Sequence, residues 1–181
     1  MSIKKSFYIN KEWDGTSLDC LAQIQIDVAL TDAGLQIQFV SWVHDDECPP
    51  TQPDPEKGTW ELWNYEVVEI FLVGENEEYT EIEMGAWGHH LILQLNGPRS
   101  IVRKDIPMQY ESFNGDGRWV GSGFVERKWL PEKIVRANAF AIHTTDGKRR
   151  YCCHTPLPGP KPDFHQPDRF ALWDEIGSGT D

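Results

Sequence analysis

The stretch EYTEIEMGAWGHHLILQL, residues 78–95, repeats apolar side chains at alternate positions on both sides of a Gly-Ala-Trp-Gly sequence. A period of two is typical of β-strands, and glycine adopts the backbone angles that tight turns require. We therefore expect a β-hairpin in which residues 85–88 form a four-residue loop and Met84 lies opposite His89. In this register the core face carries Thr80, Ile82, Met84, His89, Leu91, Leu93 and Leu95.

The opposite face of this hairpin is polar and has two interpretations. An antiparallel sheet commonly presents such a face to water. A pyranose ring, however, has an apolar C–H face for an aromatic ring and hydroxyls for paired donors and acceptors. In the expected register Glu83 lies opposite His90, Tyr79 lies opposite Gln94, and Trp87 projects from the loop. The candidate sugar-binding residues here are Tyr79, Glu81, Glu83, Trp87, His90 and Gln94.

Period-two segments recur along most of the chain. They are residues 23–30 and 34–42, joined by Thr-Asp-Ala, and residues 79–84, 89–95, 118–125, 137–144, 149–155 and 169–173. Residues 61–74, ELWNYEVVEIFLVG, are apolar on both parities, which indicates a central strand covered on each side. Pro131 limits the helical candidate, residues 128–136, to a turn or two. The pattern predicts an all-β, antiparallel β-sandwich, jelly-roll or immunoglobulin-like, with at most short helical turns.

The length of 181 residues suits one domain spanning residues 1–181. Two long loops interrupt the strand pattern: residues 44–58 are acidic and proline-rich, and residues 157–169 are proline-rich. Loops at the ends of a rigid sandwich commonly carry function, although they can equally be solvated connections. We expect residues 174–181 to form a flexible tail.

The pair Asp146-Gly147 predicts a second hairpin with a two-residue turn. Pairing Thr145 with Lys148 places Phe140, Ile142, Tyr151 and Cys153 on one side as core. The reverse side carries two small alanines beside polar groups and is a second candidate groove: Ala139, Ala141, His143, Arg150, Cys152 and His154. A zinc ion held by the histidines and Cys152 would lack a clear fourth ligand, so we expect no metal and no cofactor.

Composition limits the partners. The formal net charge is −12 at pH 7, which argues against nucleic acid or an anionic membrane surface as partner. No apolar run approaches the roughly 20 residues of a membrane span, and no secretory signal is visible. We therefore expect a cytoplasmic protein with reduced cysteines that binds a carbohydrate, another neutral small molecule or a protein.

Catalysis has little support in the sequence, and we leave the enzyme question open while favouring a non-catalytic role. Glu81 and Glu83 could lie ~6.5 Å apart, a separation that glycosidases use but that any acidic strand repeats. No nucleophile elbow, phosphate loop, dinucleotide motif or zinc-protease motif occurs. Glu66 and Glu69 have opposite parities in the central strand, so one must face inward or into a groove, where it needs a partner.

Several of these segments resemble a known superfamily. LWNYEVVEIFLVG followed by YTEIEMGAWGHHLILQL, residues 62–74 and 79–95, resembles the first half of the family-nine carbohydrate-binding-module and DOMON-like β-sandwiches. RWVGSGFVERKWLP followed by NAFAIH, residues 118–131 and 138–143, resembles the second half. PDFHQPDRFALW, residues 162–173, is similar to single-domain DOMON-like proteins. The chain as a whole resembles an animal family labelled by a chromosome-four open reading frame.

The resemblance implies a β-sandwich that binds sugars, or haem in some DOMON domains, and that is usually not catalytic. Family-nine modules clamp a sugar end between two tryptophans and carry calcium in some cases; here Trp63 and Trp87 fall in or beside the matching segment. Three classes of function stay open. We favour a non-catalytic module for a neutral, carbohydrate-like ligand. A protein-interaction or scaffold domain anchored by exposed tryptophans comes second, and a glycosidase-like or metal-assisted enzyme third.

Overall fold

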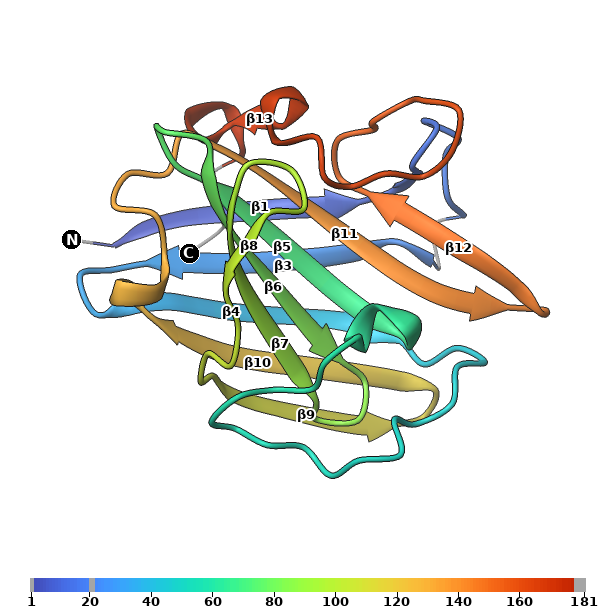
Figure 1. Ribbon diagram of the computed structural model, residues 1–181. Coiled ribbons are helices and arrows are strands. Elements are labelled where there is room, and N and C mark those ends of the chain that lie inside the picture. Colours follow the sequence, from blue (N-terminus) through green and yellow to red (C-terminus); the bar gives the residue numbers. More distant parts are fainter. Residues whose placement is uncertain (1, 20–21, 178–181) are drawn as a thin grey trace.

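The computed structural model describes residues 2–19 and 22–177, and Figure 1 shows two β-sheets packed face to face. The green and orange strands belong to one sheet, which crosses the blue and yellow strands of the other. Neighbouring strands in both sheets pair antiparallel. The predicted all-β, antiparallel β-sandwich is confirmed.

The smaller sheet has five strands, in the order β1 (Ile3–Ile9), β3 (Ile24–Leu30), β4 (Gly34–Trp42), β10 (Arg118–Glu126) and β9 (Gln109–Gly115). The hairpin predicted around Thr-Asp-Ala is β3–β4, with Leu30 opposite Leu35. Burial alternates along both strands, because one face packs on the core and the other faces solvent.

The larger sheet has the order β2 (Lys11–Glu12), β12 (Lys148–Cys153), β11 (Arg136–Thr145), β5 (Val67–Val73), β6 (Glu78–Gly85), β7 (His90–Asn96) and β8 (Ile101–Arg103), and β13 (Ala171–Leu172) also pairs with β11. Every residue of β5 is buried, as predicted for a strand covered on each side. The β11–β12 hairpin has the predicted register, with Thr145 opposite Lys148.

Short 3-10 turns connect the strands. They are η2 (Leu62–Asn64), η3 (Arg127–Trp129), η4 (Pro167–Arg169) and η5 (Trp173–Glu175). The helical turn expected in residues 128–136 is η3, which ends before Pro131, and the chain then enters β11. Nowhere in residues 2–19 or 22–177 does a helix have the length and hydropathy to cross a membrane.

Two apolar clusters cover the two faces of the larger sheet. The inner cluster fills the space between the sheets and includes Phe7, Ile37, Ile70, Ile82, Trp119 and Ala139. The outer cluster lies on the opposite face and includes Leu62, Phe71, Tyr79, Leu93, Phe140, Phe164 and Phe170. The outer cluster also includes side chains from residues 157–170 and from the segment around η2. Little of the larger sheet is therefore exposed to solvent.

The β6–β7 register differs from the expected one by a residue. Met84 lies opposite His90 rather than His89, because Gly85 stays in the strand and its N–H donates to the carbonyl of His89 at 2.8 Å. The loop therefore has three residues, and its last one, Gly88, has a φ of 83° that favours glycine.

This one-residue change reverses the faces of β7. Leu91, Leu93 and Leu95 lie opposite Glu83, Glu81 and Tyr79 on the outer face. The expected pairs of Glu83 with His90 and of Tyr79 with Gln94 are therefore wrong. The two apolar layers explain the change, since alternating residues of β7 can pack on either side of the sheet.

The C-terminal segment packs on the smaller sheet as far as it is described. The amide of Ser6 donates to the carbonyl of Gly177 at 3.0 Å, and the ammonium of Lys5 donates to the carbonyl of Ile176 at 2.8 Å. Residues 174–177 of the expected tail are thus held by β1, whereas residues 178–181 lie outside the described residues.

Candidate functional site

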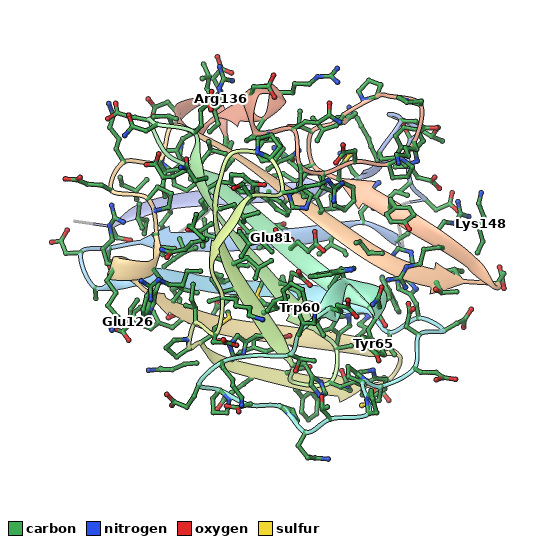
Figure 2. The ribbon with its side chains drawn as sticks, viewed as in Figure 1. Trp60, Tyr65, Glu81, Glu126, Arg136 and Lys148 are labelled. Carbon is green, nitrogen blue, oxygen red and sulfur yellow. The ribbon has the colours of Figure 1, made fainter. Side chains whose placement is uncertain are left out.

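A pocket of about 420 Å³ opens on the outer face of the larger sheet. Figure 2 places Glu81 near the middle of this sheet, with Trp60 and Tyr65 beside the connection that precedes β5. Leu93, Leu95 and Ile142 contribute apolar parts of the lining. On this face the glutamates of β5 and β6 lie beneath apolar side chains of the outer cluster rather than in water.

One wall of the pocket is the loop of residues 157–169. The ring of Phe164 stacks on Phe140, with centroids 4.0 Å apart and an interplanar angle of 13°. The hydroxyl of Tyr79 lies 2.8 Å from Nδ1 of His165 and accepts a bond of 3.1 Å from the amide of Arg99. Arg99 also forms an ion pair of 2.7 Å with Asp163. These contacts hold the loop against the sheet.

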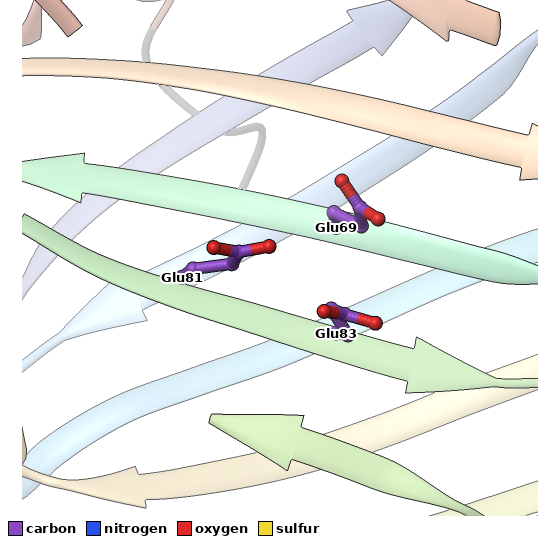
Figure 3. Close-up of side chains that lie close together, drawn as sticks. All are labelled: Glu69, Glu81 and Glu83. Carbon is purple, nitrogen blue, oxygen red and sulfur yellow. The ribbon is translucent and has the colours of Figure 1, made fainter. Parts of the chain in front are cut away.

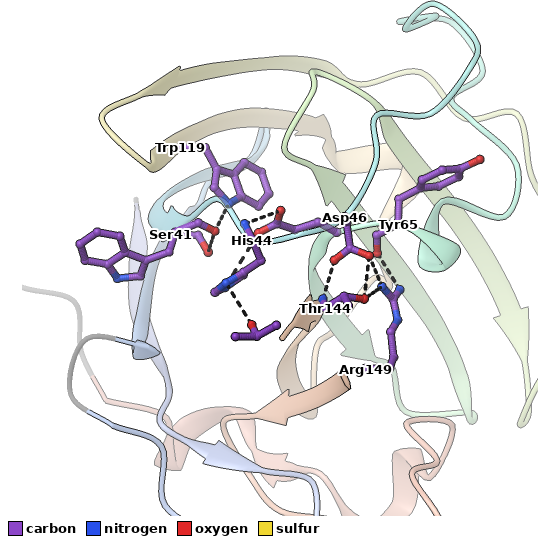
Figure 4. Close-up of polar contacts among 10 residues, drawn as sticks. Ser41, His44, Asp46, Tyr65, Trp119, Thr144 and Arg149 are labelled. Atoms are coloured by element: carbon purple, nitrogen blue, oxygen red, sulfur yellow. Dashed lines mark hydrogen bonds and ion pairs between the residues drawn. The ribbon is translucent and has the colours of Figure 1, made fainter. Parts of the chain in front are cut away.

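The other wall comes from the segment around η2. The rings of Trp60 and Trp63 meet edge to face, with centroids 5.2 Å apart. The guanidinium of Arg149 donates to the carbonyls of Trp63 and Tyr65 at 2.7 and 2.8 Å. It also forms an ion pair of 2.5 Å with the buried carboxylate of Asp46, as Figure 4 shows. Arg149 therefore fixes the backbone that carries Trp63.

The floor of the pocket carries three carboxyl groups, which Figure 3 shows close together. Glu69 of β5 lies opposite Glu83 of β6, and Glu81 follows on the same face of β6. One oxygen from each lies within 4.8 Å of the others, and the residues are 2%, 0% and 4% exposed respectively. Neither oxygen of Glu83, nor Oε2 of Glu81, forms a hydrogen bond of good geometry to a group outside the three carboxyls among the described residues, although the backbone amide of Trp63 acts on Glu83 and lowers its pKa slightly.

Burial controls the protonation of these groups. It raises the pKa of Glu81 to about 7, and it raises the pKa values of Glu69 and Glu83 well above the ordinary value. The mutual repulsion of the carboxylates raises the pKa values of Glu69 and Glu83 further. The cluster therefore retains protons near neutral pH and can both donate and accept hydrogen bonds.

The rim of the pocket is held neutral by the same effect. Burial lowers the pKa of His165 to about 4 and raises the pKa of Tyr79 to about 12. Near neutral pH both groups are uncharged, so each can offer a donor or an acceptor. Arg99 and Asp163 add one charge of each sign at the opening.

The structure divides the predicted site residues among three places. Trp63 and Glu81 line the pocket, while Glu83 lies beneath it in the carboxyl cluster and Tyr79 braces its wall. Trp87, His90 and Gln94 are elsewhere.

The indole of Trp87 packs against the inner core cluster. His90 Nε2 lies 3.2 Å from the carbonyl of Ile106, and the amide of Gln94 donates to the carbonyl of Trp129 at 3.1 Å. All three side chains thus make their contacts on the side of the hairpin that faces away from the pocket.

The second candidate groove is closed. Ala139 and Ala141 are 0% and 2% exposed, because they face the inner core and pack with the smaller sheet. His143 stacks on His44 with centroids 3.7 Å apart, and Arg150 pairs with Glu12. The expectation of an open groove on this face is therefore wrong, although its register is right.

Several lining residues escaped sequence analysis. Glu69 carried a signal that was used only in part: the sequence left Glu66 and Glu69 as alternatives for the carboxylate that faces inward or into a groove, and in the structure both are 2% exposed while Glu69 lines the pocket. Arg99 and His165 carried no such signal, because they belong to turns whose position on the sheet no periodicity encodes.

No protein-family model matches the sequence. One solved structure, described as a putative carbohydrate-binding protein from Bacteroides uniformis, is similar with a TM-score of 0.63 and 14% identity. The match covers 93% of this chain and 84% of that chain. At this identity the similarity shows a shared fold, in agreement with the predicted carbohydrate-binding-module-like sandwich.

Animal relatives match most of the chain. A rat protein, UPF0462 protein C4orf33 homolog, is 34% identical over 171 residues, which are 91% of this chain and 85% of that protein. The human UPF0462 protein C4orf33 is 32% identical over 88% of this chain and 82% of its own length. The zebrafish homolog is 33% identical over 91% of this chain and 86% of its own length. The chain belongs to the UPF0462 family of C4orf33 proteins.

Proposed function

We propose that this protein is a non-catalytic binding module whose pocket on the larger sheet receives a carbohydrate-like ligand. The observation that carries the proposal is that Trp63 and Glu81 line one pocket of about 420 Å³. An indole provides the flat apolar surface that a sugar ring stacks on, and a carboxyl group accepts hydrogen bonds from hydroxyls. A volume of this size lies in the ordinary range for small-ligand pockets.

The preorganisation of the aromatic wall supports the proposal. Arg149 holds the backbone of Trp63 through a carbonyl, so the indole is placed before a ligand arrives. On the opposite wall, the bond between Tyr79 and His165 fixes the polar rim. Groups that are already positioned lose little conformational entropy on binding, which favours affinity.

The protonation of the three carboxyls favours binding over glycoside hydrolysis. A glycosidase needs one protonated acid and one ionised carboxylate, and their environments must separate the two pKa values. Here burial moves the pKa values of Glu69, Glu81 and Glu83 in the same direction, upward. Burial thus favours the protonated form of all three, and none is a carboxylate that its surroundings hold ionised, as a glycosidase requires of its nucleophile or base.

A second hollow offers a competing location for the same class of ligand. It lies on the outer face of the smaller sheet, has a volume of about 730 Å³, and is lined by Gln25, Gln38, Trp42 and Arg118 among others. Amides beside an indole also suit sugar hydroxyls. Its Trp42 ring already carries the guanidinium of Arg118 at 4.4 Å, which occupies one stacking face.

A glycan array on the purified protein, followed by calorimetric titration of the strongest hit, tests the proposal. Trp63→Ala should weaken that binding ~5–30-fold, since stacking of this kind contributes ~1–2 kcal/mol. The matched control, Trp42→Ala, removes an indole from the smaller sheet and should leave affinity unchanged. An array without a hit, or a loss seen with Trp42→Ala alone, would contradict the proposal.

A further inference from the structure

The three carboxyls on the pocket floor lack a cationic partner within the part of the chain that is described. None of its ion pairs includes Glu69, Glu81 or Glu83. Two arginines whose charge acts on the cluster, Arg149 and Arg99, form ion pairs with Asp46 and Asp163. Positive charge must therefore come from outside if the cluster is to ionise at low cost.

Glu83 gives an independent indication that the cluster is built for a ligand. Its side chain is 0% exposed, and neither oxygen forms a hydrogen bond of good geometry to a group outside the cluster among the described residues. The backbone amide of Trp63 acts on Glu83 and favours its charged form, but this is the smallest of the influences on its pKa. Buried acceptors without donors are costly and rare in folded proteins. Glu69 and Glu81 line the pocket, and each has an oxygen within 4.8 Å of an oxygen of Glu83, so a group bound to those two carboxyls lies next to Glu83.

The carboxyl oxygens lie close enough together for one donor group to contact all three. A primary ammonium has three N–H donors in a tetrahedral arrangement. Acceptors at ~2.8 Å from its nitrogen, the usual charge-assisted distance, lie roughly 4.6 Å from one another. The three carboxyl oxygens lie within 4.8 Å of each other.

We propose that Glu69, Glu81 and Glu83 receive a primary ammonium group, so that the ligand of this pocket is an amine-bearing molecule of the amino-sugar type. The identification of the ligand as a sugar rests on the proposed function, whereas the ammonium site does not. One ionised carboxylate and two protonated carboxyls carry a total charge of −1, which balances the +1 charge of one ammonium. The raised pKa values of the three carboxyls agree with two of them keeping their protons.

The aromatic lining supports a cationic organic ligand. The faces of indole and phenyl rings attract ammonium groups. The ammonium of Lys104, 4.8 Å from the ring centroid of Trp60, shows this attraction within the wall and occupies one face of that ring, so the ligand's stacking partner is Trp63. The three carboxyls contain six oxygens, the lower limit for calcium, and the neighbouring side chains of Phe71, Leu93 and Ile142 add none. An organic cation therefore fits this surface better than a bare metal ion.

Two matched ligand sets test the proposal on the full chain by calorimetric titration near neutral pH. The first compares glucosamine, galactosamine and mannosamine with their N-acetyl forms and parent sugars. The second compares benzylamine with benzyl alcohol, which have similar shapes and differ in charge. Hydrogen bonds to charged groups are strong enough that each amine that binds should do so at least about tenfold more tightly than its neutral counterpart.

Substitutions locate the ammonium. Glu83→Gln and Glu69→Gln should each weaken amine binding about tenfold or more, because an amide cannot ionise and presents its own N–H groups. The matched control is Glu66→Gln, which alters a glutamate that is also 2% exposed but lies outside the pocket. It should leave amine affinity unchanged. Circular dichroism checks that each variant folds, and two cluster variants keep the test available if one does not.

The outcomes separate this inference from the proposed function. Neutral sugars that bind as tightly as amino sugars would overturn the ammonium site and leave the carbohydrate proposal standing. Benzylamine binding that depends on Glu83, without binding of any sugar, would do the reverse. A calcium chloride titration that saturates the cluster and blocks amines would replace the ammonium with a metal ion. Absence of binding by every amine would overturn the inference.

Discussion

Glu69 and Glu83 lie directly opposite each other on β5 and β6, and their side chains are 2% and 0% exposed. Like charges opposed across two strands destabilise a sheet, and burial increases the cost of ionisation. The pair is tolerated because burial and mutual repulsion raise both pKa values well above the ordinary value, so the carboxyls hold protons. The pocket floor is thus a destabilised spot on an apolar sheet face, which is typical of a functional site.

Glu83→Gln should stabilise the ligand-free protein. The amide has nearly the same shape, does not ionise and can donate to its carboxyl neighbours. We expect a gain of about 1–2 kcal/mol in the free energy of unfolding at pH 8, measured by urea titration. Ile82→Ala, on the inner face of the same strand, is the contrast and should lose about 2–5 kcal/mol. A loss of stability in Glu83→Gln would show that the carboxylate is a structural group.

Glu66 gives the protein a pH-dependent stability. Burial raises its pKa from the ordinary 4.5 to about 7, so the folded chain keeps a proton that the unfolded chain releases in this window. Its contribution to stability is therefore present below pH 4.5 and is lost as the pH rises to about 7. The difference amounts to about 3 kcal/mol at most.

The variant Glu66→Gln isolates this contribution, because it keeps an oxygen for the amide of His44, which donates to Glu66 at 3.1 Å. Urea unfolding at pH 4.5 and pH 8 should show a smaller decrease with pH in the variant than in the parent. Equal decreases would place the dependence on other groups. The carboxyl cluster of the pocket acts in the same direction in both proteins and cancels in the comparison.

Cysteine reactivity should follow exposure. Cys48 is exposed, whereas Cys152 and Cys153 are buried on opposite faces of β12 with pKa values raised to about 12 by burial. Alkylation of the native protein at pH 8, followed by peptide mapping, should modify Cys48 before the adjacent pair, which should react only after denaturation. Rapid labelling of Cys152 or Cys153 in the native state would mean that β12 opens readily.

The hydroxyl of Tyr79 should control the order of the pocket wall. It joins His165 to the amide of Arg99 across two loops. Tyr79→Phe keeps the ring packing and should cost about 1 kcal/mol of stability. Hydrogen exchange should become faster at residues 163–166 and at Arg99, with little change in β11. Uniform exchange in the two proteins would show that ring stacking alone holds the loop.

The sequence predicts the sandwich because its strands carry period-two patterns and its second hairpin carries a strong turn signal. Asp146-Gly147 gave the right register, since a two-residue turn leaves a single pairing. The Gly-Ala-Trp-Gly loop allowed two registers, because Gly85 can end a strand or continue it, and the wrong one was chosen.

The pocket was only partly predictable. Glu81 was named as part of the polar face of the expected hairpin and Trp63 through the family resemblance, and both line the pocket. The carboxyl cluster forms because Glu69 and Glu83 lie opposite each other on neighbouring strands. The periodicity of each strand by itself does not predict which residues of the two strands lie opposite each other. The cover supplied by Phe164 and His165 comes from a proline-rich loop, whose path over the sheet follows from tertiary packing.

The location of the ligand is the central claim, and tryptophan indole N–H signals in a heteronuclear NMR titration test it most directly. The protein would be labelled with nitrogen-15, and the signals assigned by single Trp→Phe variants and followed during addition of the strongest glycan-array or amino-sugar ligand. Trp60 and Trp63 line the pocket, so their signals should shift with a common saturation curve while Trp42 and Trp119 stay unchanged. Shifts confined to Trp42 would place the ligand on the smaller sheet and contradict the account.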